Sequence, residues 1–271
     1  MRHFLFCVLL CFSWPFLSVA ADDSKLPPAQ ELLDGCIGTL PDIPLVITGQ
    51  LQSKSKDGDI ETRINVEMLL DWQAEPPTAR YTLRDNFGHA LEHLAVTWLP
   101  DQPPEYRYFQ GDPLVAAPVP VLSEPVRNTD ISWMDLSLSF LWWPGGKTVG
   151  AEELRSRTCY VLEIPAPADS FGGCSKVRLW IDPQINIMLR ADAYGADEKF
   201  VRRMDVKGFK KINGRWVIQH VEVESYPSRH RTVLRVRDVQ DRTRKSYLRD
   251  DAGPAGEEVE GVEPVPVATD E

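Results

Sequence analysis

The segment "KFVRRMDVKGFKKINGRWVIQHVEVESY", Lys199–Tyr226, determines the fold class. Two runs rich in β-branched residues flank Asn213-Gly214, and this dipeptide is a strong signal for a two-residue hairpin turn. Two strands joined by so short a connection must run antiparallel. The segment therefore predicts a long antiparallel hairpin.

Runs of the same texture continue on both sides of this hairpin, with short turns such as Asp57-Gly58 and Asn86-Phe87-Gly88 between them. Because the connections are short, neighbouring strands are predicted to pair antiparallel. The chain is thus expected to be mainly β (α+β), with about ten or eleven strands in a single curved antiparallel sheet that forms an incomplete β-barrel. The other runs are residues 45–54, 61–72, 79–88, 90–98, 105–109, 158–164, 175–182, 187–195 and 230–239.

Two segments are predicted to be helices. Residues 27–41 read as a short helix, with Pro28 in its first turn and Gly38 near its end. Residues 129–143 begin with a capping-box pattern, Ser132 and Asp135, and carry an unusually wide apolar face. Pro144-Gly145-Gly146 ends this second helix. Its apolar face must be buried, and the concave face of the curved sheet is the expected place.

The first 21 residues read as a secretory signal peptide. Arg2 precedes an apolar run, and small residues at positions 18–21 offer a cleavage site. No later segment approaches the ~20 apolar residues that a membrane-spanning helix needs. We therefore expect a signal peptide at 1–21, one domain at 27–240, and an exported protein.

Residues 241–271 form a third region, which is predicted to be a disordered acidic tail. From Asp250 onward it holds eight acidic residues and no basic ones, which is most of the chain's net charge of −10. The tail is rich in Gly, Pro, Glu and Val and has no aromatic residue beyond that point, so it cannot bury enough surface to fold.

Three cysteines remain after the signal: Cys36, Cys159 and Cys174. Cys36 is predicted to be a buried residue of the first helix. Cys159 and Cys174 lie on consecutive strands of one predicted hairpin, and export would permit a disulfide between them. The strand register, which the sequence leaves open, decides whether their Cβ atoms come close enough.

The motifs that suggest chemistry are weak. "GGKT" (145–148) lacks the earlier glycine of a phosphate loop and follows a helix, so nucleotide binding is not expected. "HALEH" (89–93) matches an inverted zinc-peptidase pattern, with His89, Glu92 and His93 as the zinc site. On a strand, however, residues four apart are ~13 Å apart, too far to share one zinc ion. We expect a strand here, no metal, no cofactor and no catalytic residues.

Basic residues cluster on the hairpin quoted first. Without a supporting fold motif, an exported protein is not expected to bind nucleic acid. A solvated face of the sheet is the expected explanation, and contact with an anionic membrane surface or an acidic partner is the alternative. The residues are Arg202, Arg203, Lys207, Lys210, Lys211 and Arg215.

Three motifs between residues 130 and 182 resemble the outer-membrane lipoprotein-sorting family, the superfamily of the LolA carrier and the LolB receptor. The pattern D-[IL]-S-x-x-D-L matches at Asp130, Ser132, Asp135 and Leu136, and the resemblance covers about residues 29–239. The second motif, Y-x-L-x-[IL]-x-P, fits loosely at Tyr160, Leu162, Ile164 and Pro167. The third matches at Lys176, Val177, Leu179, Trp180, Ile181 and Asp182.

This resemblance implies an open antiparallel barrel whose helices cover an apolar cavity. The implied function is a periplasmic, non-enzymatic carrier that shelters lipoprotein acyl chains or another lipid. The alternatives are an envelope sensor of the same fold acting through a membrane-protein partner and, more remotely, the zinc hydrolase. The candidate lid residues of the cavity, on the second helix, are Trp133, Met134, Leu138, Leu141, Trp142 and Trp143.

Overall fold

The computed structural model describes residues 26–100, 102–167, 171–212 and 215–242. The predicted signal peptide, the Asn213-Gly214 turn and nearly all of the predicted tail lie outside these residues. No helix in the described part of the chain is long and apolar enough to span a membrane.

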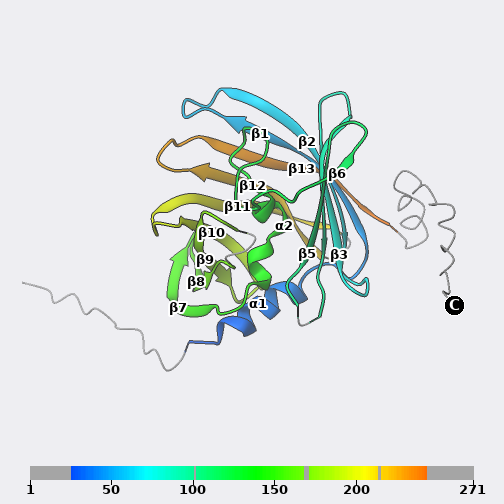
Figure 1. Ribbon diagram of the computed structural model, residues 1–271. Helices are drawn as coiled ribbons and strands as arrows, with labels where there is room; N and C mark the ends of the chain where they lie inside the picture. Colours follow the sequence, from blue (N-terminus) through cyan, green and yellow to red (C-terminus); the bar gives the residue numbers. More distant parts are fainter. Residues whose placement is uncertain (1–25, 101, 168–170, 213–214, 243–271) are drawn as a thin grey trace, which may run out of the picture.

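The described strands form one antiparallel sheet that bends around α2, as Figure 1 shows. Its order is β6-β5-β4-β3-β2-β1-β13-β12-β11-β10-β9-β8-β7, so every neighbour except the β1–β13 pair is consecutive in the chain. The predicted fold class is confirmed. The strands are β1 Leu45–Lys54, β2 Ile60–Asp71, β3 Thr78–Arg84, β4 Ala90–Thr97, β5 Glu105–Gln110, β6 Val115–Ala117, β7 Lys147–Leu154, β8 Arg157–Pro165, β9 Cys174–Asp182, β10 Ile187–Gly195, β11 Phe200–Ile212, β12 Arg215–Ser225 and β13 Arg231–Asp241.

The described residues form thirteen strands, more than the ten or eleven predicted, because the sequence pattern does not indicate the two edge strands β6 and β7. β6 has only three residues, too few to show a period, and lies in a Pro-rich stretch. β7 is mostly exposed and therefore lacks the apolar alternation that marks a half-buried strand. One edge strand is very short and the other is mostly exposed and carries charged residues, and both features limit unwanted edge pairing in natural sheets.

The first helix, α1 Ala29–Gly38, forms where it was predicted and lies across one end of the curved sheet (Figure 1). Its buried residues, Ala29, Leu32, Leu33 and Cys36, recur at the spacing of one helical face. Thr39 ends the helix, and its hydroxyl donates a hydrogen bond to the carbonyl of Cys36 at 2.7 Å.

The second predicted helix is shorter than expected. It divides into α2 Trp133–Ser137 and a 3-10 turn, η2 Ser139–Trp142, at Leu138, whose φ is 49°. The predicted capping box is present: Ser132 Oγ accepts from the Asp135 amide, and Asp135 accepts from the Ser132 amide. Ser137 Oγ donates to the carbonyl of Trp133, a local bond that competes with continued helix.

The main core fills the space between the concave face of the sheet and these helices. Along β11 and β12, Met204, Val206, Val221 and Val223 alternate with outward-facing residues and are all nearly inaccessible to solvent. A smaller apolar cluster lies on the opposite face of β7–β10 and includes Val161 and Trp180.

The register of β8 and β9 answers the question that the sequence left open: it places Cys159 and Cys174 at opposite ends of the hairpin, and no disulfide joins them in this structure. Cys159 adjoins the pair Tyr160–Ile181, whereas Cys174 lies beyond the pair Pro165–Lys176. Cys36, Cys159 and Cys174 are all free thiols.

We predict that Gly49→Ala destabilises the protein by roughly 1–3 kcal/mol, the usual cost of overpacking. Gly49 lies at a bulge between β1 and β13, and a Cβ there would approach the Arg235 carbonyl oxygen to 2.8 Å. Gly150→Ala is the matched control, since a Cβ at that site meets no atom within 4 Å. Urea denaturation of both variants checks this, and equal midpoints would contradict it.

Candidate functional site

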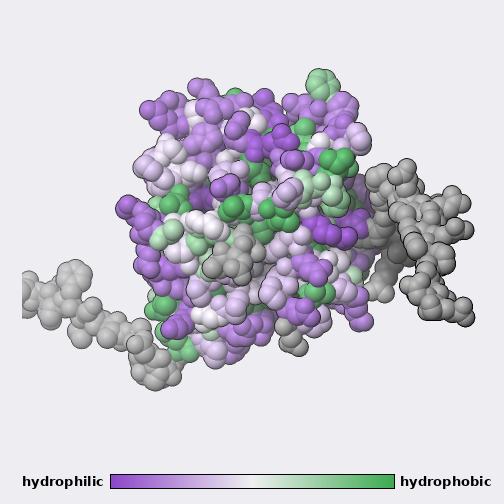
Figure 2. All heavy atoms as spheres, viewed as in Figure 1, coloured by the Kyte–Doolittle hydropathy of each residue, from purple (hydrophilic) through white to green (hydrophobic). Residues whose placement is uncertain are grey.

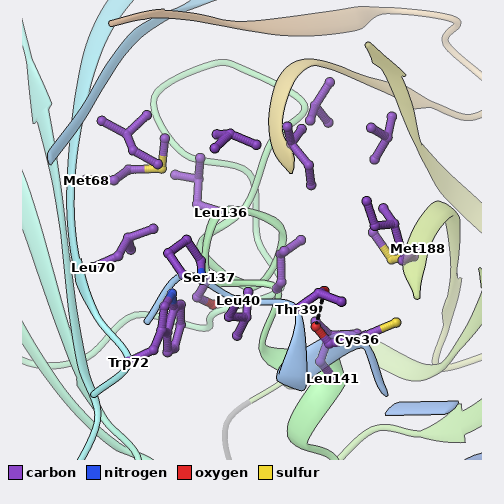
Figure 3. A pocket seen from close by; sticks show the side chains of 18 of the residues that line it. Cys36, Thr39, Leu40, Met68, Leu70, Trp72, Leu136, Ser137, Leu141 and Met188 are labelled. Atoms are coloured by element: carbon purple, nitrogen blue, oxygen red, sulfur yellow. Dashed lines mark hydrogen bonds between the residues drawn. The ribbon is translucent and has the colours of Figure 1, made fainter. Parts of the chain in front are cut away.

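An apolar cavity of about 460 Å³ lies between the sheet and α2. Figure 3 shows Met68 and Leu70 of β2 on one side, Met188 of β10 on the other, and Leu136 of α2 between them. Figure 2 shows a largely hydrophilic surface on which hydrophobic residues gather near the middle of the face, around the place of α2 in Figure 1. The inner sheet surface is completed by Ile47, Tyr81, Met204, Val206, Val221 and Leu234.

Three of the six candidate lid residues line this cavity: Leu138, Leu141 and Trp142. The other three are placed in the core instead, and all are less than 5% exposed. Trp133 packs edge-on against Tyr108, with ring centroids 6.2 Å apart, and Trp143 contacts Phe171 at 4.6 Å. The sequence could not separate the two sets, because the break at Leu138 changes which side chains face inward.

Three tryptophans from distant parts of the chain meet at the edge of the cavity. The ring centroid of Trp142, in η2, lies 5.4 Å from that of Trp72 and 4.8 Å from that of Trp98. The centroids of Trp72 and Trp98 are 4.7 Å apart. Trp72 and Trp142 line the cavity. Because Trp72 and Trp98 directly follow β2 and β4, this cluster attaches η2 to the sheet through aromatic contacts.

The end of α1 and the loop after it form another part of the wall. Cys36, Leu40 and Pro41 line the cavity, facing Ile187 and Met188 at the β9–β10 turn. Burial raises the pKa of the Cys36 thiol to about 12. The thiol is therefore neutral at any physiological pH and acts as a small apolar side chain.

A buried arginine, which was expected on a solvated face, holds α2 against the sheet. Arg202 of β11 is 7% exposed, and its Nε lies 3.2 Å from Asp135 Oδ2. Its guanidinium also donates to Ser132 Oγ at 3.1 Å and to the Ser123 carbonyl at 3.0 Å. One inward-facing side chain thus binds the cap of α2 and the loop that precedes it.

A second polar anchor holds the chain two residues before that cap. Asp130 is 3% exposed and accepts hydrogen bonds from Ser225 at 2.6 Å and Thr232 at 2.8 Å. His230 Nδ1 lies 2.7 Å from Asp130 Oδ2, and its Nε2 lies 2.9 Å from Glu61. Ser53 Oγ lies 3.1 Å from the same Nε2. Ser53 is fully buried, and its hydroxyl also donates a hydrogen bond to the Asn128 carbonyl. The arrangement therefore ties the root of the lid to β1, β2, β12 and β13.

We predict a pH-dependent contribution from His230. Burial alone would lower its pKa, but the hydrogen bond to Glu61 and the charge of Asp130 outweigh it, and the net pKa is raised above 6.5. The stabilisation is complete below about pH 6.5 and is lost as the pH rises through the folded-state pKa. Its size is on the order of 1 kcal/mol, since Glu61 is half exposed.

The test is the free energy of unfolding measured across this alkaline limb for wild type and His230→Asn. We expect the wild type to lose more stability with rising pH than the variant. Parallel curves would contradict the role of His230.

The "HALEH" segment forms a turn and the start of β4, as its texture predicted, rather than a helix. His89 is exposed and lies 3.3 Å from Asp85, while His93 Nδ1 lies 2.9 Å from Thr82 Oγ1. Burial, and then the charges of Arg80 and Arg84, lower the pKa of His93 to about 4. Among the described residues, no three His, Cys, Asp or Glu side chains are grouped to hold a metal ion.

The basic residues of the first-quoted hairpin do not form one solvated face. Arg202 points inward, Arg203 pairs with Asp192 at 2.6 Å, and Lys207 pairs with Asp205 at 3.1 Å. Lys210 and Lys211 are exposed. The side chain of Arg215 lies outside the described residues.

A family described as "-like: Uncharacterized protein" matches residues 121–247. The curated proteins contain no match.

Solved structures gave similarities over most of the chain. A putative outer-membrane lipoprotein-sorting protein domain from Vibrio parahaemolyticus has a TM-score of 0.67 at 11% identity, covering 82% of this chain and 96% of that one. A DUF1329 family protein from Desulfovibrio piger has 0.65 at 14%, covering 80% and 94%. A LolA superfamily protein from Nitrosomonas europaea has 0.63 at 14%, covering 82% and 97%. At such identities the similarity establishes the fold, and the chain therefore has the LolA-like fold that its sequence motifs predicted.

Proposed function

We propose that the protein is an exported carrier that shelters acyl chains, of a lipoprotein or another lipid, in its apolar cavity. The observation that carries this proposal is the cavity itself: about 460 Å³, lined mainly by aliphatic side chains, Met and Trp. An alkyl chain transferred there from water gains ~0.8 kcal/mol for each buried CH₂ group. Sheltering of this kind needs no covalent chemistry.

The lid gives the proposed carrier a way to admit its ligand. Leu138, Leu141 and Trp142 cover the cavity from a short α2 and a single 3-10 turn, which are joined at a residue with positive φ. The root of this segment is fixed by Arg202 and Asp130, whereas its far end makes mainly apolar contacts. We propose that the far end moves and the root stays in place.

The fold supports the same proposal, because solved structures with it include a putative lipoprotein-sorting domain. Export is the remaining part of the proposal, and it rests on the signal peptide predicted at 1–21. A periplasmic location would place the protein where lipids must cross water between two membranes.

The test is saturable binding of the apolar fluorescent probe N-phenyl-1-naphthylamine and its displacement by long-chain alcohols and diacylglycerol. Leu70→Trp fills the cavity and is expected to weaken binding by about tenfold, since ~1.4 kcal/mol corresponds to that factor. Leu69→Trp is the matched control, since Leu69 is the same residue type on the same strand but its side chain lies on the other face.

The affinity of Leu69→Trp for the probe is expected to stay within about twofold of the wild-type affinity. The carrier proposal fails if the wild-type protein shows no saturable binding, or if both variants weaken the probe equally.

A further inference from the structure

The sheet has a slit between β12 and β13. Their ladder ends at the pair His220–Arg235, although both strands continue beyond it. Beyond that rung, β12 still pairs with β11 as far as Arg215, and β13 still pairs with β1 as far as Asp241. The two strands are neighbours in the sheet (Figure 1), yet their facing edges are unpaired from residue 219 back to 215 and from 236 onward.

Two β-bulges explain why the strands separate there. On β12 the register shifts between the pairs Gly208–His220 and Phe209–Ile218, which leaves Gln219 as the extra residue. On β13 it shifts between Thr48–Asp238 and Gly49–Val236, which leaves Arg237 as the extra residue. A bulge bends its strand and increases the local twist. Two bulges at the same level, on both sides of one gap, turn the strands apart.

The slit adjoins the apolar cavity through three shared residues. A second pocket of about 320 Å³ lies in the slit, and Val217, Ile218 and Val236 line both this pocket and the cavity. These three apolar side chains are therefore the boundary between the two spaces. An alkyl chain passing between the two spaces would contact these three aliphatic side chains.

The outer end of the slit is cationic. Lys210, Lys211 and Arg237 line it and are exposed. In the part of the chain that the structure describes, the side chains of Lys210 and Arg237 take part in no hydrogen bond or ion pair, unlike Arg203 and Lys207 on the same hairpin. One acid shares the rim, Asp238, and its carboxylate accepts a hydrogen bond from Gln240 at 2.6 Å.

We propose that this slit binds a single-chain amphiphile with an anionic head, such as a fatty acid or an alkyl phosphate. The head is held by Lys210 and Arg237 outside the sheet, and the chain runs between β12 and β13 into the cavity. This inference rests on the proposed function, which supplies the cavity as an acyl-chain site, and adds the charge class of the ligand and its route of entry. The cations favour this occupant over an extended peptide, which would need unpaired backbone but no positive charge.

The test compares dodecanoate, dodecyl phosphate and dodecanol, which share one alkyl chain and differ in the head group. Their affinities are measured by probe displacement at neutral pH and low salt. Wild type is expected to bind both anions about tenfold more tightly than the alcohol, as two charge-assisted contacts would give. Raising the salt should reduce this preference, because exposed charges are screened.

The double variant Lys210→Glu/Arg237→Glu is expected to lose the preference while keeping its affinity for dodecanol. Arg63→Glu/Arg107→Glu is the matched control: it makes the same change in net charge at two exposed residues on β2 and β5, away from the slit. Both pairs are exposed, and unchanged melting curves would confirm that the variants fold.

The outcomes separate this inference from the function on which it rests. Equal affinity of wild type for all three ligands, or a preference that survives Lys210→Glu/Arg237→Glu, overturns the slit assignment and leaves the carrier proposal standing. If none of the three ligands binds, the carrier proposal fails as well. A preference for only one of the two anions would identify the head group as carboxylate or phosphate.

Discussion

Asp135→Ala is expected to destabilise the protein by about 3–5 kcal/mol, the cost of leaving a buried charge without its partner. Arg202 and Asp135 have side chains only 8% and 5% exposed, so water cannot replace the lost carboxylate. Asp135 also accepts hydrogen bonds from the amide and hydroxyl of Ser132, at 2.8 and 2.7 Å, and both would lose their acceptor. The measurement is the midpoint and slope of urea denaturation followed by tryptophan fluorescence.

Two controls make this prediction specific. Asp192→Ala removes the partner of Arg203, one residue along the same strand, but Arg203 is 30% exposed and can turn to solvent. We expect that variant to cost about 1 kcal/mol. In Arg202→Met/Asp135→Leu, which removes both charges, most of the lost stability should return. A loss of less than about 1 kcal/mol in Asp135→Ala would contradict the prediction, because it would show that the variant does not leave Arg202 as a buried charge without a partner.

Sheet content and topology could be predicted because they depend on local signals. Turns such as Asp57-Gly58 and the alternation of Met204 and Val206 with polar residues are visible without knowledge of any distant contact. The two edge strands, β6 and β7, could not be predicted, because a strand that buries neither face has no alternation of apolar and polar residues. The capping box at Ser132 was also predictable, but the break at Leu138 was not.

The polar anchors of the lid were harder to predict. Arg202 occupies the same alternation as Met204 and Val206, so its position alone indicated an inward side chain. The neighbouring Arg203 and Lys207 are also basic, and this cluster of charges suggested a solvated face instead. His230 and Asp130 are a hundred residues apart, and no local pattern connects them.

The cavity also depends on long-range register. The tryptophan cluster brings together Trp72, Trp98 and Trp142 from three separate elements, and only the last was a candidate. The slit arises from bulges on two strands, each of which is a shift of one residue in pairing. Such shifts leave composition and periodicity almost unchanged, so they appear only when the paired strands are known.

Trp133→Ala is expected to cost about 3–5 kcal/mol in stability, as large-to-small changes in a packed core do. Trp133 is 2% exposed on α2 and packs against Tyr108, but it does not line the cavity. The expected result is therefore a lowered urea midpoint with little change in probe affinity under conditions where the variant is still folded. The loss of stability comes from the cavity that the missing indole leaves in the core, which a shift of the short α2 cannot fill.

Trp142→Ala is the matched comparison, with the same substitution nine residues later. Its ring is half-buried, stacks on Trp72 with an interplanar angle of 18°, and lines the cavity. Losing it removes lid surface more than core, so we expect a smaller loss of stability and a several-fold weaker affinity for the probe. Trp133→Ala should therefore lower the stability more than Trp142→Ala does, whereas Trp142→Ala should weaken probe binding more. If Trp133→Ala weakened the probe as much as Trp142→Ala did in the folded state, the division of this segment into a core half and a lid half would be wrong.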